Sequence, residues 1–241
     1  MQHVDVQYLE PLRSFTTPSE FNAVLDKFHS RLSLFALLLA SWLATVSSGV
    51  QALELSDVAL EGELRFLAMR PDPGAYWYES RVQISEASLQ TGVVQISTCH
   101  RALDPNQKIV VAFNPERVRT ITVVSTEGVG RSEVQGHLVE LTDVKRGGSV
   151  CIDLSSRALD RVDDRNWRLH AGPLMRRYLD GYLPMQARLA FHWPEGLLRL
   201  KTTQPGEQPG VRITASPAGA ELDLVFAGRM RATLDLQHSQ P

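Results

Sequence analysis

The sequence has few of the residues and spacings that most often identify a chemical activity. Its 241 residues include only two cysteines, which are not spaced as Cys-x-x-Cys, so a dithiol redox motif is absent. Four of the seven histidines, His100, His137, His170 and His192, lie in the body of the chain after the apolar run; they are scattered singly and form no His-x-His, His-x-x-x-His or Cys/His cluster. These absences lead us to predict no metal site and no cofactor.

Motifs for covalent catalysis and phosphate binding are also missing. There is no Gly-x-Ser-x-Gly elbow, and the glycines of "GVGRS" and "RGGSV" lack the strand-loop-helix context that a phosphate loop needs. The aspartates of "DRVDDR", residues 160–165, alternate with arginines, which fits a salt-bridged surface loop better than acid–base chemistry. We predict no catalytic residue and keep a hydrolase with an unrecognised site as an alternative.

The longest apolar run predicts export. Residues 32–53 carry no charge over 22 positions, which is long enough for a helix to cross a hydrocarbon core of about 30 Å. Lys27 and Arg31 precede the run and acidic residues follow it, so the charge bias places everything after it outside the cytoplasm. A buried core helix is disfavoured because the run is apolar on all faces.

Two fates of this run are compatible with the sequence. Val50 and Ala52 fit the −3 and −1 positions of a peptidase site, which predicts a signal peptide that is cleaved before Leu53. The 31 residues before the run are many for a secretory n-region. Either translation starts downstream, at Val24 or Leu25, or the run is an uncleaved membrane anchor.

We therefore predict an N-terminal extension with a signal peptide or anchor over residues 1–52, and a single exported domain over residues 53–241. The domain is expected in the periplasm or outside the cell, or held at the inner membrane if the anchor is retained. It carries 22 basic and 23 acidic residues, a net charge of −1, without a basic tract. Such a surface cannot neutralise phosphates, which argues against nucleic acid as a partner.

Period-two alternation of apolar and polar residues recurs through the predicted domain, separated by turns such as "RPDPG", "KRGGS" and "QPGEQPG". Many short strands joined by such turns indicate a mainly β fold, an antiparallel β-sandwich or barrel-like domain. The predicted strands are 60–66, 77–85, 92–98, 108–114, 118–125, 133–144, 149–155, 185–193, 197–203, 210–216, 221–228 and 230–237.

The alternation breaks over residues 157–184, where charged and aromatic residues are densest. Within this segment "PLMRRYLDGYL" places Leu174 and Tyr178 at helical spacing, with Pro173 suited to a first helical turn and Gly181 to a helix end. We predict one short helix here, across an end or face of the sheet. The segment could also separate two β subdomains.

Both cysteines, Cys99 and Cys151, lie in the predicted exported domain. An oxidising compartment makes a disulfide between them the expected state, and the bond would close a loop of 53 residues and tie strand to strand. Two buried reduced thiols are the alternative.

The best candidate for an interaction surface is the same break in the pattern. Arginine and aromatic side chains together provide contact area, stacking and bidentate recognition of anions. The alternative is that the aromatic residues cap the β core while the arginines face water. The candidate binding residues are Trp167, Arg168, Arg176, Arg177, Tyr178 and Tyr182.

The sequence thus favours a non-enzymatic binding or accessory protein of the cell envelope that contacts another envelope protein. Membrane contact is expected only through the apolar run. A carrier of a lipid or other apolar ligand is the other alternative, and it predicts a continuous apolar cavity. The residues expected to line that cavity are Leu189, Phe191, Leu198, Leu222, Leu224 and Phe226.

Overall fold

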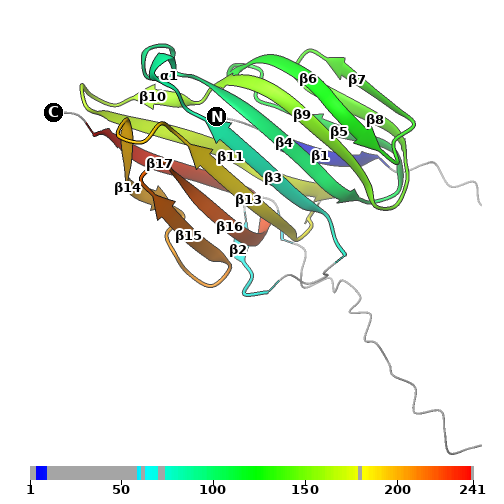
Figure 1. The fold of residues 1–241 in the computed structure, drawn as a ribbon. Coiled ribbons are helices and arrows are strands. Elements are labelled where there is room, and N and C mark those ends of the chain that lie inside the picture. Colours follow the sequence, from blue (N-terminus) through cyan, green and yellow to red (C-terminus); the bar gives the residue numbers. More distant parts are fainter. Residues whose placement is uncertain (1–3, 10–58, 61–62, 70–73, 179–180, 240–241) are drawn as a thin grey trace, which may run out of the picture. The chain divides into compact units, whose positions relative to one another are not determined.

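The computed structural model describes residues 4–9, 59–60, 63–69, 74–178 and 181–239. The predicted signal or anchor helix lies outside these residues. Within them the chain is mainly β, with antiparallel pairing predominant and one short helix, as the alternation predicts (Figure 1).

The strands form two sheets. The first has the order β14 (Leu198–Gln204), β17 (Met230–His238), β11 (Asn166–Tyr178), β1 (Val4–Leu9), β5 (Asn106–Ala112), β8 (Leu138–Val144) and β7 (Arg131–Gln135), with β10 (Leu159–Arg161) and β12 (Gly181–Tyr182) paired to β11. The second has the order β15 (Val211–Ser216), β16 (Gly219–Gly228), β13 (Met185–His192), β3 (Trp77–Gln83), β4 (Val93–Leu103), β9 (Gly148–Arg157) and β6 (Val118–Glu127), with β2 (Leu64–Phe66) paired to β16.

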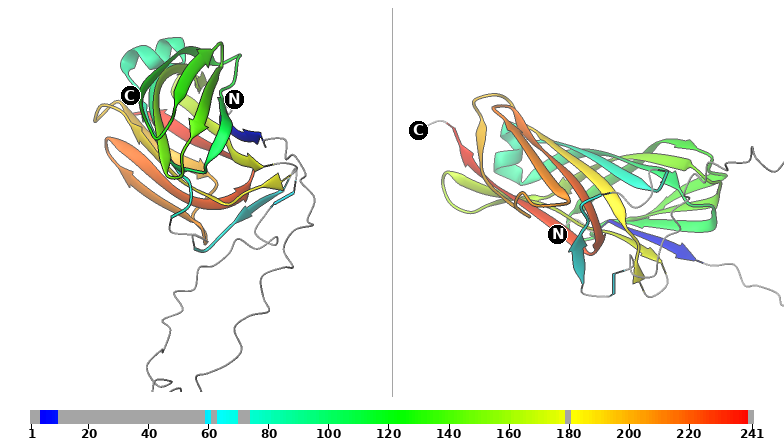
Figure 2. Two further views of the ribbon diagram at one scale, coloured as in Figure 1. Left: turned by 90° about the vertical axis from the view of Figure 1, so that its right-hand side faces the viewer. Right: turned by 90° about the horizontal axis from the view of Figure 1, so that it is seen from below.

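A shared hydrophobic core lies between the two sheets, which appear as two layers of strands in Figure 2. In β16, Leu222, Leu224 and Phe226 are fully buried while Glu221 and Asp223 point outward, as period-two alternation requires. Each such apolar side chain contributes about 1.5–3 kcal/mol when fully buried. All six residues proposed to line a lipid cavity belong to this core.

The prediction of a helix after Pro173 is wrong, because the segment is the second half of strand β11. Leu174 faces the main core, whereas Met175 packs in a smaller cluster with Tyr182. Two adjacent buried residues remove the period-two pattern, and their spacing to the next apolar residue then resembles that of a helix. Residues that precede and residues that follow the segment 157–184 in the sequence pack in the same hydrophobic core.

The short helix is α1 (Glu86–Thr91), in a segment for which we predict none. Ser85 and Ser88 form a capping box at its start, and Gly92 ends it in the left-handed region with φ of 73°. The predicted strand 133–144 is instead the β7–β8 hairpin, whose turn contains Gly136 with φ of 62°.

Cys99 and Cys151 form the predicted disulfide, and it does tie strand to strand. The two residues face each other directly in the β4–β9 pairing, with their Cα atoms 4.1 Å apart. The bond lies on the outer side of the second sheet, where both cysteines are half-buried. A helix of the length and apolarity needed to cross a membrane does not occur in the described part of the chain.

Gly219, at the β16–β13 contact, tests this packing. A Cβ atom there would lie 2.3 Å from the carbonyl oxygen of Phe191, a backbone atom that the sheet holds in place. We expect Gly219→Ala to lower the free energy of unfolding by about 2 kcal/mol or more in urea titrations, because the strands must separate. The control is Gly206→Ala, where a Cβ meets nothing within 4 Å and a change of about 0.5 kcal/mol at most is expected. If the two substitutions lowered the free energy of unfolding equally, the register of the β13–β16 pairing would be contradicted.

Candidate functional site

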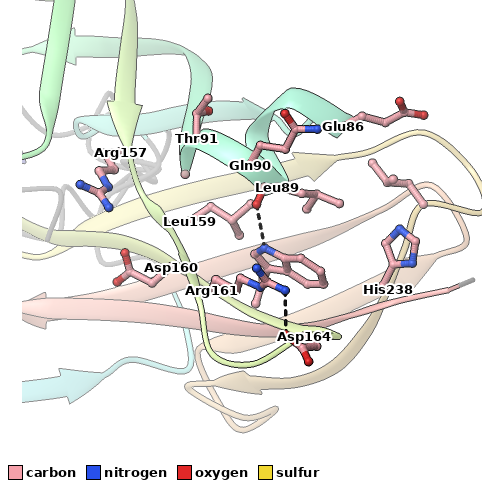
Figure 3. A pocket seen from close by; sticks show the side chains of 13 residues that line it. Glu86, Leu89, Gln90, Thr91, Arg157, Leu159, Asp160, Arg161, Asp164 and His238 are labelled. Carbon is pink, nitrogen blue, oxygen red and sulfur yellow. Dashed lines mark hydrogen bonds and ion pairs between the residues drawn. The ribbon is translucent and has the colours of Figure 1, made fainter. Parts of the chain in front are cut away.

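A polar hollow of about 930 Å³ lies at one end of the two sheets, beside α1. Its walls come from α1, the end of β9, strand β10, the start of β11 and the end of β17 (Figure 3). The lining residues are Glu86, Leu89, Gln90, Thr91, Gly92, Arg157, Leu159, Asp160, Arg161, Asp164, Trp167, Leu197 and His238.

Trp167 forms part of the wall and offers little free ring surface. Its side chain belongs to the core, with the residue only 6% exposed, and its indole Nε1 donates a hydrogen bond to the carbonyl oxygen of Leu89 at 3.2 Å. The ring of His238 lies 6.0 Å away, centroid to centroid. This tryptophan therefore fixes α1 against β11 and shapes the hollow.

Some charges in the hollow are already paired and others are not. Asp160 accepts hydrogen bonds from Arg117, at 3.0 Å, and from His170 Nε2, at 3.1 Å. Arg161 donates to Asp164 at 2.9 Å, as the dashed line in Figure 3 marks. Two lining residues, Arg157 and Glu86, make no ion pair with any described residue. Their charges are available to a ligand or partner.

The six predicted binding residues do not form one surface, since β11 distributes five of them over its two faces and Tyr182 belongs to β12. Trp167 lines the hollow, while Arg168 points outward and pairs with Asp235 at 2.7 Å. Tyr182 is buried in the smaller core cluster. Arg176 is also buried, and Arg177 and Tyr178 are half-buried near the end of β11. Sequence reasoning missed the residues of α1, for which the only local signal is the capping pattern of Ser85 and Ser88. Arg157 belongs to the predicted segment 157–184 but is not among the six candidate residues.

A buried polar cluster surrounds Arg176. Its guanidinium pairs with Asp104, donates to the carbonyl oxygen of Pro184 at 3.2 Å and lies over the ring of Tyr76, 5.5 Å from its centroid. The hydroxyl of Tyr76 is 2.7 Å from His100 Nδ1. These groups connect β11 to β4 and to the residues before β3, so the cluster ties the two sheets together.

His100 is held neutral in this cluster. The residue has no exposed surface, and burial lowers the pKa of its imidazole from 6.5 to about 3. Its Nε2 atom has no hydrogen-bond partner among the described residues. Removing a charged imidazolium from water would cost free energy, and this cost keeps the ring of His100 unprotonated.

The other histidines do not converge. His170 meets the carboxylate of Asp160, and its pKa is lowered by burial and by Arg117, against the opposing effect of Asp160. His192 is exposed and lines a second hollow of about 550 Å³, whereas His137 lies in the β7–β8 turn. Among residues the structure describes, no cluster of three or more His, Cys, Asp or Glu could hold a metal ion.

Comparisons with known proteins identify no family for this chain. No protein-family model matches the sequence, and no curated protein does. Among solved structures it is similar to an M1 zinc metallopeptidase from Deinococcus radiodurans, with 10% identity and a TM-score of 0.36 over 74% of this chain and 43% of that one. It is also similar to an aminopeptidase A from Legionella pneumophila in complex with aspartic acid, with 8% identity and a TM-score of 0.28 over 73% of this chain and 23% of that one.

The chain thus spans less than half the length of these proteins. At such TM-scores the likeness supports no inference about fold or function.

The neutral state of His100 predicts a specific acid sensitivity. Because the folded-state pKa of about 3 lies below the ordinary value of 6.5, the unfolded chain binds the extra proton. The contribution of His100 to stability is therefore fully present above pH 6.5 and is lost as the pH falls toward 3, by up to about 1.4 kcal/mol per pH unit.

Urea titrations at pH 7, 5.5 and 4.5 measure this loss. His100→Asn keeps a polar side chain facing Tyr76 without a titrating ring, so we expect the variant to lose less stability than the wild type over this range. If the two proteins lost stability in parallel, His100 would not be the group responsible.

Proposed function

We propose that this chain is exported to the cell envelope and acts there by binding another envelope protein, without catalysis of its own. The apolar run and the two cysteines support export to the envelope. The polar hollow supports the site at which the partner binds.

Two observations support the location. The Cys99–Cys151 disulfide is compatible with an oxidising compartment outside the cytoplasm. The uncharged run over residues 32–53, preceded by Lys27 and Arg31, fits a signal peptide or an anchor. Either would deliver the domain to the same side of the membrane.

The polar hollow beside α1 is the observation that supports binding of a partner protein at this end of the sheets. Its walls include residues 157–167, the first part of the segment 157–184 that sequence analysis singles out. It also contains Arg157 and Glu86, whose charges have no ion-pair partner among the described residues. Unpaired charges of both signs at a concave surface favour a partner with a complementary charged pattern, which gives specificity and a faster encounter. An apolar ligand is less favoured, because the residues proposed to hold it fill the core.

The location is tested on the chain purified from its own host. We expect an N-terminus at Leu53, shown by intact mass and N-terminal sequencing, and a Cys99–Cys151 peptide in a non-reducing map. A membrane-bound chain with the same disulfide would show that the apolar run is retained as a membrane anchor. A chain in the cytosol with Met1 intact and both thiols reduced would refute export.

The contact is tested by charge reversal in cells. A photo-crosslinking residue at Glu86 should capture a defined envelope protein, and Arg157→Glu should reduce the yield of that adduct severalfold, because it reverses a charge in the hollow. The matched control is Arg146→Glu, an exposed arginine in the β8–β9 turn outside the hollow. Equal yields for the two variants would exclude the hollow as the contact.

A further inference from the structure

Strand β1 occupies a position in the first sheet that no other described strand fills. It runs parallel to β11, with Val4 opposite Leu174 and Tyr8 opposite Tyr178. On its other edge it is antiparallel to β5, with Asp5 opposite Ala112 and Leu9 opposite Lys108. It is the strand that connects the two halves of this sheet.

Without β1, the sheet would contain a gap one strand wide, which we call the β5–β11 slot. Strands β5 and β11 pair with β1 and not with each other. Since adjacent strands lie about 4.8 Å apart, β5 and β11 are separated by about twice that distance, too far for direct hydrogen bonds. The empty slot would leave backbone donors and acceptors without partners along both strands.

The slot borders the hydrophobic core. On β5, Ile109 and Val111 have no exposed surface, and on β11 Leu174 is 2% exposed. An unoccupied slot would therefore bring water next to core side chains as well as to unpaired backbone groups. Both effects favour an extended segment in this position.

Closing the slot by direct pairing of β5 with β11 is opposed by the surrounding structure. Strand β5 follows β4 after only two residues, Asp104 and Pro105, and β4 is joined to β9 by the disulfide. Asp104 also pairs with the buried Arg176 of β11. These connections hold the start of β5 in place relative to β11.

The position of β1 in the sequence gives the slot a functional meaning. Val4–Leu9 precedes the apolar run, whereas every other described strand follows it. If the chain is exported as proposed above, cleavage before Leu53 removes β1, and an uncleaved anchor leaves it on the opposite side of the membrane. In both cases the exported domain has no β1 of its own.

We propose that the β5–β11 slot is a strand-binding site, and that in the exported protein it receives an extended segment of a partner polypeptide, parallel to β11 and antiparallel to β5. Such addition of a strand derives affinity from main-chain hydrogen bonds and specificity from alternate side chains. The sequence of β1, "VDVQYL", indicates the class of segment: β-branched, apolar or aromatic residues alternating with polar ones. This inference rests on the proposed export.

A synthetic peptide of residues 1–10, MQHVDVQYLE, serves as the probe, and the same peptide with Val6→Pro is the control. Proline at the central position removes a backbone donor and is excluded from a central strand. On chain purified from its host with its N-terminus at Leu53, we expect saturable binding of the first peptide only. The backbone N–H of Phe113 points toward β8, where it donates to His137, so the alternate amides of Val110 and Ala112 face the slot. Binding should slow amide exchange at Val110 and Ala112 by at least about tenfold.

If the peptide does not bind, and these β5 amides are as protected without it as Val139 of the central strand β8, the slot proposal is wrong while export stands.

A second experiment does not depend on export. It compares full-length recombinant wild type, whose slot is filled by β1, with the full-length Val6→Pro variant. We expect the peptide to bind the variant and not the wild type. Failure to bind a folded variant would overturn the slot proposal, and should the variant not fold, the host-purified chain remains the deciding sample. A host-purified chain that retains Met1 in the cytosol would instead overturn export, and with it a partner strand as the occupant.

Discussion

Backbone pairing along both edges of β11 is the constraint on which the rest of the structure depends. One edge pairs with β17 and β12, and the other with β10 and β1. The second half of the strand is also buried on both faces, against two separate clusters. A strand so enclosed has no freedom to shift its register, and the elements that flank it inherit that rigidity.

This strand also links the two places at which the molecule could meet a partner. Trp167, near its start, lines the polar hollow, and the stretch from Leu174 to Tyr178 borders the β5–β11 slot. Arg176, in the part of β11 that borders the slot, connects this strand to Asp104 and Tyr76. Hydrophobic packing is not directional, whereas the hydrogen bonds of a buried polar cluster are made in one arrangement of the two sheets. The cluster therefore helps to fix how the sheets are placed against each other.

The sequence predicts the β class, the disulfide and the approximate position of each strand that is buried on one face only. In such a strand apolar and polar residues alternate, and this alternation is visible in the sequence. The prediction fails for β11, whose buried Leu174 and Met175 leave no such alternation. It also fails for β1, whose pairing depends on strands a hundred residues away or more. The candidate site is recognised only in part, because Trp167 and Arg157 meet α1 through the fold and not through any local spacing.

The placement of the disulfide has a consequence for how the protein withstands proteases. Strands β5, β6, β7 and β8 all lie between Cys99 and Cys151 in the sequence. A peptide bond cut in any of the turns among them would leave both fragments covalently joined through β4 and β9, at a point where the two strands are already paired. A nicked molecule would thus keep its architecture and would reveal the damage only after reduction.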